Sequence, residues 1–132
     1  MSTMKITVPA IRDRKEKGPK LAVLTAYDAT MARLLDDGGA DILLVGDSLG
    51  MVVQGQPSTL AVTIEEMAYH ARMVARVTRR AHVVADLPFM SFQVSSEKAL
   101  EAAGRLMKEG GVEAVKLEGG VAIAETVRRI VT

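Results

Sequence analysis

Charged and hydroxyl side chains follow three short apolar segments of the chain. They are Asp47 and Ser48 after residues 42–45, Asp86 at the end of residues 82–86, and Lys116 and Glu118 at the end of residues 114–118. Short continuous apolar runs are typical of buried parallel strands, and α/β sheets carry their chemistry where such strands end. We therefore expect these side chains to gather at one edge of a sheet.

Three of these residues, Asp47, Asp86 and Glu118, are carboxylates. A carboxylate at a strand end is also common as a solvated turn residue or a helix cap, and that interpretation stays open for each aspartate. Three carboxylates in one small volume repel one another unless a cation neutralises them. A ligand set of oxygens without His or Cys favours Mg²⁺ over zinc. The pattern therefore predicts one Mg²⁺ bound by Asp47, Asp86 and Glu118.

Lys116 and Glu118 share a face of their strand because they are two residues apart. If the alternate residues face covering helices, this pair faces the interior, where unpaired charges are costly. A bound ion or ligand must then compensate them. We expect Lys116 and the Ser48 hydroxyl to donate hydrogen bonds to an anionic group of a substrate beside the metal.

Strand and helix patterns alternate four times along the chain. Strands are expected at residues 21–27, 42–45, 82–86 and 114–117, and helices at 28–37, 63–75, 95–109 and 121–131. Asp28, the Thr63–Glu66 capping box and Ser95 or Ser96 are the expected helix starts. Residues 47–62 are rich in Gly, Gln, Pro, Ser and Thr, which predicts a structureless connection such as a lid or binding loop.

Alternating strands and helices predict an α/β fold with parallel strands and helical crossovers. Four such units are half of a (β/α)8 TIM barrel, which needs about 250 residues. We therefore predict one domain over residues 1–132, the amino-terminal half of such a barrel, with a short amphipathic helix in residues 1–18 that covers one end. The chain is expected to be a fragment or a shortened version of something longer.

Composition restricts the classes of partner. Seventeen basic and sixteen acidic residues give a net charge of +1, so no global field attracts nucleic acid or an anionic membrane. Aromatic residues make up only 3% of the chain, which argues against a stacking platform for bases. No run approaches the about 20 apolar residues of a membrane span. The absence of cysteine excludes disulfides and thiolate chemistry, and the cytoplasm is the default location.

Residues 46–49, Gly-Asp-Ser-Leu, also match the nucleophile block of a family of serine esterases. That mechanism needs a base, normally an Asp-x-x-His late in the chain, and an Asn or Gly that binds the oxyanion. The chain has no Asp-x-x-His and no asparagine, which disfavours this reading. His70 and His82 are expected to be structural.

Seven blocks of sequence together resemble the ketopantoate hydroxymethyltransferase family, in the family's order and over nearly the whole chain. They are Thr-Ala-Tyr-Asp at 25–28, Val-Gly-Asp-Ser-Leu-Gly-Met at 45–51, Gln-Gly at 54–55 with Ser-Thr-Leu at 58–60, Ala-Tyr-His at 68–70, Ala-Asp-Leu-Pro-Phe-Met at 85–90, and Val-Lys-Leu-Glu-Gly-Gly at 115–120.

The resemblance implies a (β/α)8 barrel in which Asp47, Asp86 and Glu118 match the magnesium ligands. Asp47, Ser48, Asp86 and Lys116 match positions that hold or adjoin the 2-oxo acid substrate. The implied reaction moves a hydroxymethyl group from 5,10-methylenetetrahydrofolate to 3-methyl-2-oxobutanoate and gives 2-dehydropantoate, a step of pantothenate synthesis. The family's general base is a glutamate in the carboxyl-terminal half, so no catalytic base is expected within residues 1–132.

The resemblance further implies a cytoplasmic homo-oligomer, commonly a decamer. Two alternatives remain. One is another magnesium-dependent lyase or mutase that acts on 2-oxo acids with a related barrel. The other is a non-catalytic truncated product that pairs its open sheet edges with a second copy, because unpaired parallel edges are prone to association.

Overall fold

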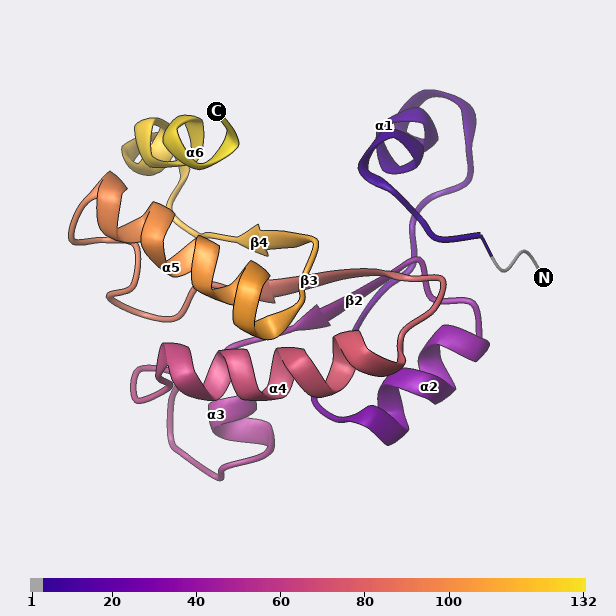
Figure 1. Cartoon of the computed structure of the whole chain (residues 1–132), viewed down its shortest axis with the longest axis horizontal. Coiled ribbons are helices and arrows are strands. Elements are labelled where there is room, and N and C mark those ends of the chain that lie inside the picture. The colour runs from indigo at the N-terminus through magenta and orange to yellow at the C-terminus, as the bar shows by residue number, and fades with distance from the viewer. Residues whose placement is uncertain (1–3) are drawn as a thin grey trace.

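The computed structural model of the chain describes residues 4–132 and contains one parallel sheet of four strands. The strands are β1 (Val23–Thr25), β2 (Ile42–Val45), β3 (His82–Asp86) and β4 (Ala114–Lys116), hydrogen-bonded in the order β1-β2-β3-β4 (Figure 1). The register aligns Leu44 with Thr25 and Val84, and Asp86 with Lys116. The predicted alternation of strands and helices with parallel pairing is confirmed.

Three helices cover one face of the sheet: α2 (Ala29–Asp37), α4 (Ile64–Val77) and α5 (Ser96–Gly110). The strand residues on that face are essentially inaccessible to solvent: Leu43, Val45, Val83 and Ala85. They belong to one hydrophobic core with Met67, Val74 and Leu106 from the helices. Leu44 and Val84 on the opposite face are only half-buried, so the core lies between the sheet and these helices.

Local capping explains where the helices begin and end. Asp28 accepts the backbone N–H of Met31 at 2.8 Å, and Thr63 forms the predicted capping box with Glu66. Ser95, and not Ser96, caps α5. Gly111 ends α5 with φ of 71°, a left-handed conformation that glycine adopts without steric cost.

Several expected elements differ in extent. Strand β1 spans only Val23–Thr25, since it lies at the sheet edge and pairs with β2 alone. The expectation that residues 47–62 are structureless is wrong, because a short helix α3 (Leu49–Val52) forms there and Leu49 and Val62 are buried in the core. The last helical segment opens with a 3-10 turn η1 (Gly120–Ile123) before α6 (Ala124–Val131).

The predicted leading helix is α1 (Val8–Lys17); residues 1–3 of the segment lie outside the described part. No residue of α1 is buried, and the helix stands apart from the sheet in Figure 1. Two contacts join this segment to the rest of the fold: the N–H of Ile6 donates to the Arg80 carbonyl at 2.8 Å, and Arg14 of α1 lies 3.3 Å from the Asp41 carboxylate.

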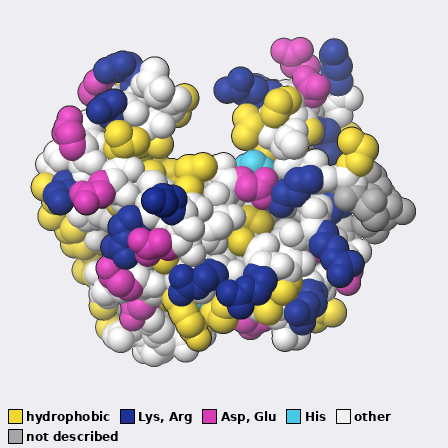
Figure 2. Space-filling view, viewed as in Figure 1, with side chains coloured by type: hydrophobic (Ala, Val, Ile, Leu, Met, Phe, Trp, Pro, Cys, Tyr) yellow, Lys and Arg dark blue, Asp and Glu magenta, His cyan; other side chains and the backbone are white. Residues whose placement is uncertain are grey.

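The inner face of the sheet lines a hollow. Val23, Ile42, Leu44 and Val84 line it together with Val127 of α6. Figure 2 shows a notch between α1 and α6 with hydrophobic side chains at its floor. Helix α6 separates apolar from polar residues along its length, yet none of its residues is buried. The half-sheet therefore presents an uncovered apolar surface. No helix within residues 4–132 has the length and apolar character of a membrane span.

Asp36 at the end of α2 joins two distant segments at the amino-terminal edge of the sheet. Its buried carboxylate accepts the backbone N–H groups of Arg79, Arg80 and Ala81 at 2.7, 3.2 and 2.7 Å. Burial raises the pKa of Asp36, but the hydrogen bonds from Ala81, Arg79 and Arg80 together lower it by a larger amount. The net pKa therefore lies below the ordinary value. The ionised form is thus the one that holds the start of β3.

We predict that Asp36→Ala lowers the free energy of unfolding by about 3 kcal/mol, because it leaves three N–H groups without their charged acceptor. The depressed pKa means that this contribution is complete above the unfolded-state pKa, about 3.9, and is lost as the pH falls below it. Urea unfolding at pH 7 and pH 3 measures both effects. Asp37→Ala, at the exposed neighbouring position, is the matched control. A similar loss in both variants at pH 7 would contradict the assignment.

Candidate functional site

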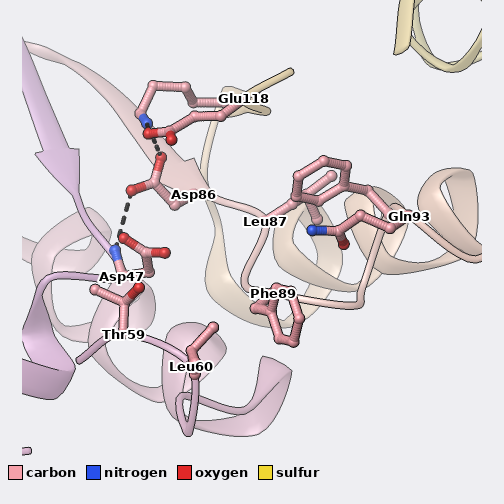
Figure 3. A pocket seen from close by; sticks show the side chains of 10 residues that line it. Asp47, Thr59, Leu60, Asp86, Leu87, Phe89, Gln93 and Glu118 are labelled. Atoms are coloured by element: carbon pink, nitrogen blue, oxygen red, sulfur yellow. Dashed lines mark hydrogen bonds and ion pairs between the residues drawn. The ribbon is translucent and has the colours of Figure 1, made fainter. Parts of the chain in front are cut away.

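A cavity of about 190 Å³ lies where β2, β3 and β4 end. Four charged side chains line it: Asp47, Asp86, Lys116 and Glu118. Figure 3 shows Glu118, Asp86 and Asp47 one below another, with Leu60 beneath them and Phe89 to the lower right. The parallel register explains the gathering, since Asp86 and Lys116 are aligned residues of neighbouring strands and Asp47 follows β2.

Asp86 is the most deeply buried of the four, with 5% of its surface exposed. Its Oδ2 atom accepts the backbone N–H of Asp47 at 3.0 Å. Its Oδ1 atom makes no hydrogen bond of good geometry within residues 4–132 and faces the Lys116 ammonium at 2.8 Å. A buried carboxylate oxygen that accepts no hydrogen bond is suited to bind a cation.

The Lys116 ammonium lies between two carboxylates, 2.8 Å from Asp86 Oδ1 and 3.0 Å from Glu118 Oε1. Burial lowers the pKa of Lys116, but the adjacent carboxylates of Asp86 and Glu118 raise it by more, so the net pKa lies above the ordinary value. Glu118 itself is largely exposed, beyond the end of β4. Lys116 is therefore firmly cationic and stands between the two acids.

The pKa shift of Asp47 favours the neutral form of its side chain, whereas that of Lys116 favours the charged form. Burial raises its pKa, and the negative charges of Asp86 and Glu118 raise it further. Lys116 and a hydrogen bond from Thr59 lower the pKa of Asp47, but by less, so the net pKa lies above the ordinary value. The single ammonium of Lys116 thus does not neutralise all three carboxylates. Additional positive charge in the cavity would stabilise the ionised form of Asp47.

The donor set suits a hard divalent cation, but it is not assembled around one point. The three predicted ligands line the same cavity, and all of their donor atoms are oxygens. Within the described residues, however, no three His, Cys, Asp or Glu side chains form a group that could hold a metal. The ammonium of Lys116 separates Asp86 from Glu118, so a metal would require Lys116 to move aside.

Ser48, predicted beside the other site residues, does not line the cavity. Ser48 directly follows Asp47 in the sequence, and its Oγ atom lies 2.7 Å from the Tyr27 hydroxyl. Gly46 keeps Ser48 close to the site: a Cβ added at Gly46 would lie 2.8 Å from Ser48 Oγ and 3.5 Å from Asp86 Oδ2. The serine hydroxyl therefore stands near the Asp86 carboxylate, at the margin of the cavity.

Some residues at or beside the cavity were not predicted from the sequence. Tyr27 follows β1 at the same edge of the sheet, and this position was the signal that could have identified it. Thr59 and Phe89 enter the cavity from loops, for which the strand-end rule makes no prediction. His70, expected to be structural, bonds through Nδ1 to the Tyr27 carbonyl at 2.7 Å.

Comparison with known proteins identifies the family. The profile of the family described as Ketopantoate hydroxymethyltransferase matches residues 5–132. The chain belongs to this family. It is 58% identical over 126 residues to the 3-methyl-2-oxobutanoate hydroxymethyltransferase of Syntrophus aciditrophicus strain SB, covering 96% of the chain and 46% of that protein. It is 55% identical over 130 residues to the protein of that name from Anaeromyxobacter sp. strain Fw109-5, covering 96% and 43%.

The chain thus spans less than half the length of these relatives of the ketopantoate hydroxymethyltransferase family. Among solved structures it is similar to a 2,3-dimethylmalate lyase of the PEP mutase/isocitrate lyase superfamily, with a TM-score of 0.69 and 20% identity, covering 93% of the chain and 47% of that protein. An oxaloacetate acetylhydrolase matches with a TM-score of 0.67 and 17% identity, covering 99% and 48%. The predicted half of a TIM-type α/β barrel is confirmed.

We predict that Gly46→Ala displaces Ser48 and lowers the free energy of unfolding by about 1–3 kcal/mol, because the new methyl group would collide with the serine hydroxyl. The matched control is Gly104→Ala in α5, where an added Cβ meets nothing within 4 Å. There the change should stabilise the chain by about 0.5–1 kcal/mol through helix propensity. Chemical unfolding of both variants measures the difference, and equal stability of Gly46→Ala and wild type would refute the close contact.

Proposed function

We propose that this chain supplies the metal-binding and substrate-binding part of a 3-methyl-2-oxobutanoate hydroxymethyltransferase. The reaction transfers a hydroxymethyl group from 5,10-methylenetetrahydrofolate to 3-methyl-2-oxobutanoate and gives 2-dehydropantoate. The observation that carries the proposal is the gathering of Asp47, Asp86, Lys116 and Glu118 on one cavity, in a chain more than half identical to proteins of that name.

Asp47, Asp86 and Glu118 are the proposed ligands of Mg²⁺. Their oxygens suit this ion, and among the residues that the structure describes the Oδ1 atom of Asp86 accepts no hydrogen bond and lies 2.8 Å from the Lys116 ammonium. When bound, Mg²⁺ acts as a Lewis acid towards the keto and carboxylate oxygens of a 2-oxo acid and neutralises the acidic side chains. No other residue within 4–132 is proposed as a ligand.

The remaining groups orient the substrate. Lys116 and the hydroxyl of Ser48 are proposed to hold the carboxylate of the 2-oxo acid, with Asp47 and Asp86 also adjoining it. Leu60 and Phe89 add apolar side chains to the lining of the cavity, which suits the branched alkyl group of 3-methyl-2-oxobutanoate. The base that removes the C3 proton is assigned to the carboxyl-terminal half of the family's barrel, so residues 4–132 bind and orient the acid.

By the same resemblance, the whole protein is proposed to work in the cytoplasm as a homo-oligomer, commonly a decamer in this family. A magnesium-dependent lyase or mutase would share the fold but would have no requirement for a folate donor. The identities of 54–58% to hydroxymethyltransferases, against 17–23% to the lyases, mutases and hydrolases of known structure, favour the transferase.

A chimera tests the proposed activity: residues 1–132 replace the corresponding part of the Syntrophus aciditrophicus relative. We expect Mg²⁺-dependent exchange of the C3 proton of 3-methyl-2-oxobutanoate in D₂O, followed by NMR, and formation of 2-dehydropantoate only when 5,10-methylenetetrahydrofolate is added. Asp86→Ala in the chimera should reduce exchange by about 100-fold or more, since it removes a proposed metal ligand. The 132-residue chain by itself should show no exchange.

The unaltered relative is the control for the chimera. Undiminished exchange in the Asp86→Ala chimera would remove this residue from the ligand set. Turnover of the 2-oxo acid without the folate donor would favour the lyase or mutase alternative.

A second test exploits the position of Lys116 between the acids. We expect Lys116→Met in the 132-residue chain to bind Mn²⁺, a spectroscopic substitute for Mg²⁺, about tenfold more tightly, equivalent to about 1.4 kcal/mol. The substitution removes the cation that competes for Asp86 and Glu118 and leaves the cavity more negative. Titration followed by electron paramagnetic resonance measures the free ion.

Lys98→Met is the matched control for this titration, because Lys98 is an exposed lysine of α5 that pairs with Glu101 away from the cavity. Its Mn²⁺ affinity should equal that of the wild type. Weaker binding of Mn²⁺ by Lys116→Met than by the wild type would show that Lys116 supports the metal site and does not compete with it.

A further inference from the structure

We propose that Tyr27 is a positioning residue for Ser48: its phenolic hydroxyl donates a hydrogen bond to Ser48 Oγ and so directs the serine proton to the carboxylate of the 2-oxo acid. This inference rests on the proposed function, in which Ser48 contacts the substrate. It adds a residue from the end of β1 to a site otherwise built from the segments that follow β2, β3 and β4.

The contact between the two hydroxyl groups is short and sheltered. Tyr27 OH and Ser48 Oγ lie 2.7 Å apart, and both side chains are half-buried. The Tyr27 ring packs against the hydrophobic core. Partial burial limits competition from water, so the Tyr27–Ser48 bond is stronger than the same bond at an exposed position.

The backbone of Tyr27 is held from two sides. The N–H of Ala26 donates to the Leu44 carbonyl at 3.0 Å, which extends the pairing of β1 with β2. His70 of α4 lies with Nδ1 at 2.7 Å from the Tyr27 carbonyl oxygen, and because a carbonyl only accepts, Nδ1 carries the proton. The main chain that carries the phenol is therefore held by contacts to both the sheet and a covering helix.

The direction of the hydrogen bond follows from the protons and lone pairs that the two hydroxyl groups carry. A serine hydroxyl has one proton and two acceptor lone pairs, and a phenol is the more acidic donor. When Ser48 donates to an anion, its proton is engaged, so Tyr27 must donate to Ser48 Oγ. Ser48 is already close to the site, because the Cβ position at Gly46 lies within 3.5 Å of both Ser48 Oγ and Asp86 Oδ2. Without the Tyr27 hydroxyl, the serine hydroxyl is free to rotate away.

A double-mutant cycle separates positioning from a merely structural contact. The affinity of the chain for 3-methyl-2-oxobutanoate is measured by calorimetry at saturating Mg²⁺. We expect Tyr27→Phe and Ser48→Ala each to weaken binding by about tenfold, and the double variant to bind no more weakly than either single one, since Tyr27 acts only through Ser48. Mn²⁺ affinity without substrate should stay unchanged in Tyr27→Phe. Additive losses in the double variant would overturn the proposal.

Tyr69→Phe supplies both a matched control and a direct probe. Tyr69 is exposed and precedes His70 on α4, so its loss should leave substrate binding unchanged. Because the chain has two tyrosines and no tryptophan, this variant retains Tyr27 as its only phenol. With ¹³Cζ-labelled tyrosine, we expect the Tyr27 signal to shift on addition of Mg²⁺ and 3-methyl-2-oxobutanoate, but not with 3-methyl-2-butanone, which lacks the carboxylate.

The two hypotheses fail in different ways. If the 2-oxo acid binds to the chain while the Tyr27 signal stays in place and Tyr27→Phe binds equally well, the positioning role is overturned and the proposed function stands. If neither the wild type nor Tyr69→Phe binds the 2-oxo acid at any Mg²⁺ concentration, the substrate assignment of the site is overturned, and the role of Tyr27 with it.

Discussion

Three carboxylates at neighbouring strand ends repel one another, and a single ammonium lies between two of them in one cavity. Lys116 contacts Asp86 and Glu118 at 2.8 and 3.0 Å, while the pKa of Asp47 is raised by burial and by the negative charges of Asp86 and Glu118. The remaining imbalance is what makes the cavity a candidate cation site. The sheet register, the glycine at position 46 and the loop after β3 all serve to keep these groups together.

The buried carboxylates at the two edges of the sheet differ in how completely they are hydrogen-bonded. At the amino-terminal edge, Asp36 accepts three backbone N–H groups, and Asp41 is bound by Arg14, by Arg80 and by the N–H of Ala22. Those carboxylates are saturated and serve stability. At the carboxyl-terminal edge, Asp86 Oδ1 accepts no hydrogen bond within residues 4–132 and lies 2.8 Å from the Lys116 ammonium. The division agrees with the general rule for barrels, in which one face supports the fold and the other carries the chemistry.

The half-barrel leaves much apolar surface uncovered. Apolar residues of the inner sheet face line an open hollow, no residue of helix α6 is buried, and the outer edges of β1 and β4 are unpaired within residues 4–132. The family relatives are more than twice as long as the part that this chain matches. The charged cavity, in contrast, is formed by β2, β3, β4 and their loops alone. The proposed metal and substrate contacts therefore belong to this part of the barrel.

Much of the site could be read from the sequence because strand ends are local features: Asp47, Asp86, Lys116 and Glu118 all follow short apolar runs, and parallel strands bring their ends to one edge. Helix starts were equally local, as at Thr63 with Glu66. The sequence could not reveal that the Lys116 ammonium stands between Asp86 and Glu118, that Ser48 turns to Tyr27, or that Leu49 anchors a helix within residues 47–62. Alternation and capping depend on neighbours in the chain, and they determined the half-barrel and its acidic edge. Side-chain pairing depends on distances between residues far apart in the chain, so only the tertiary structure decided it.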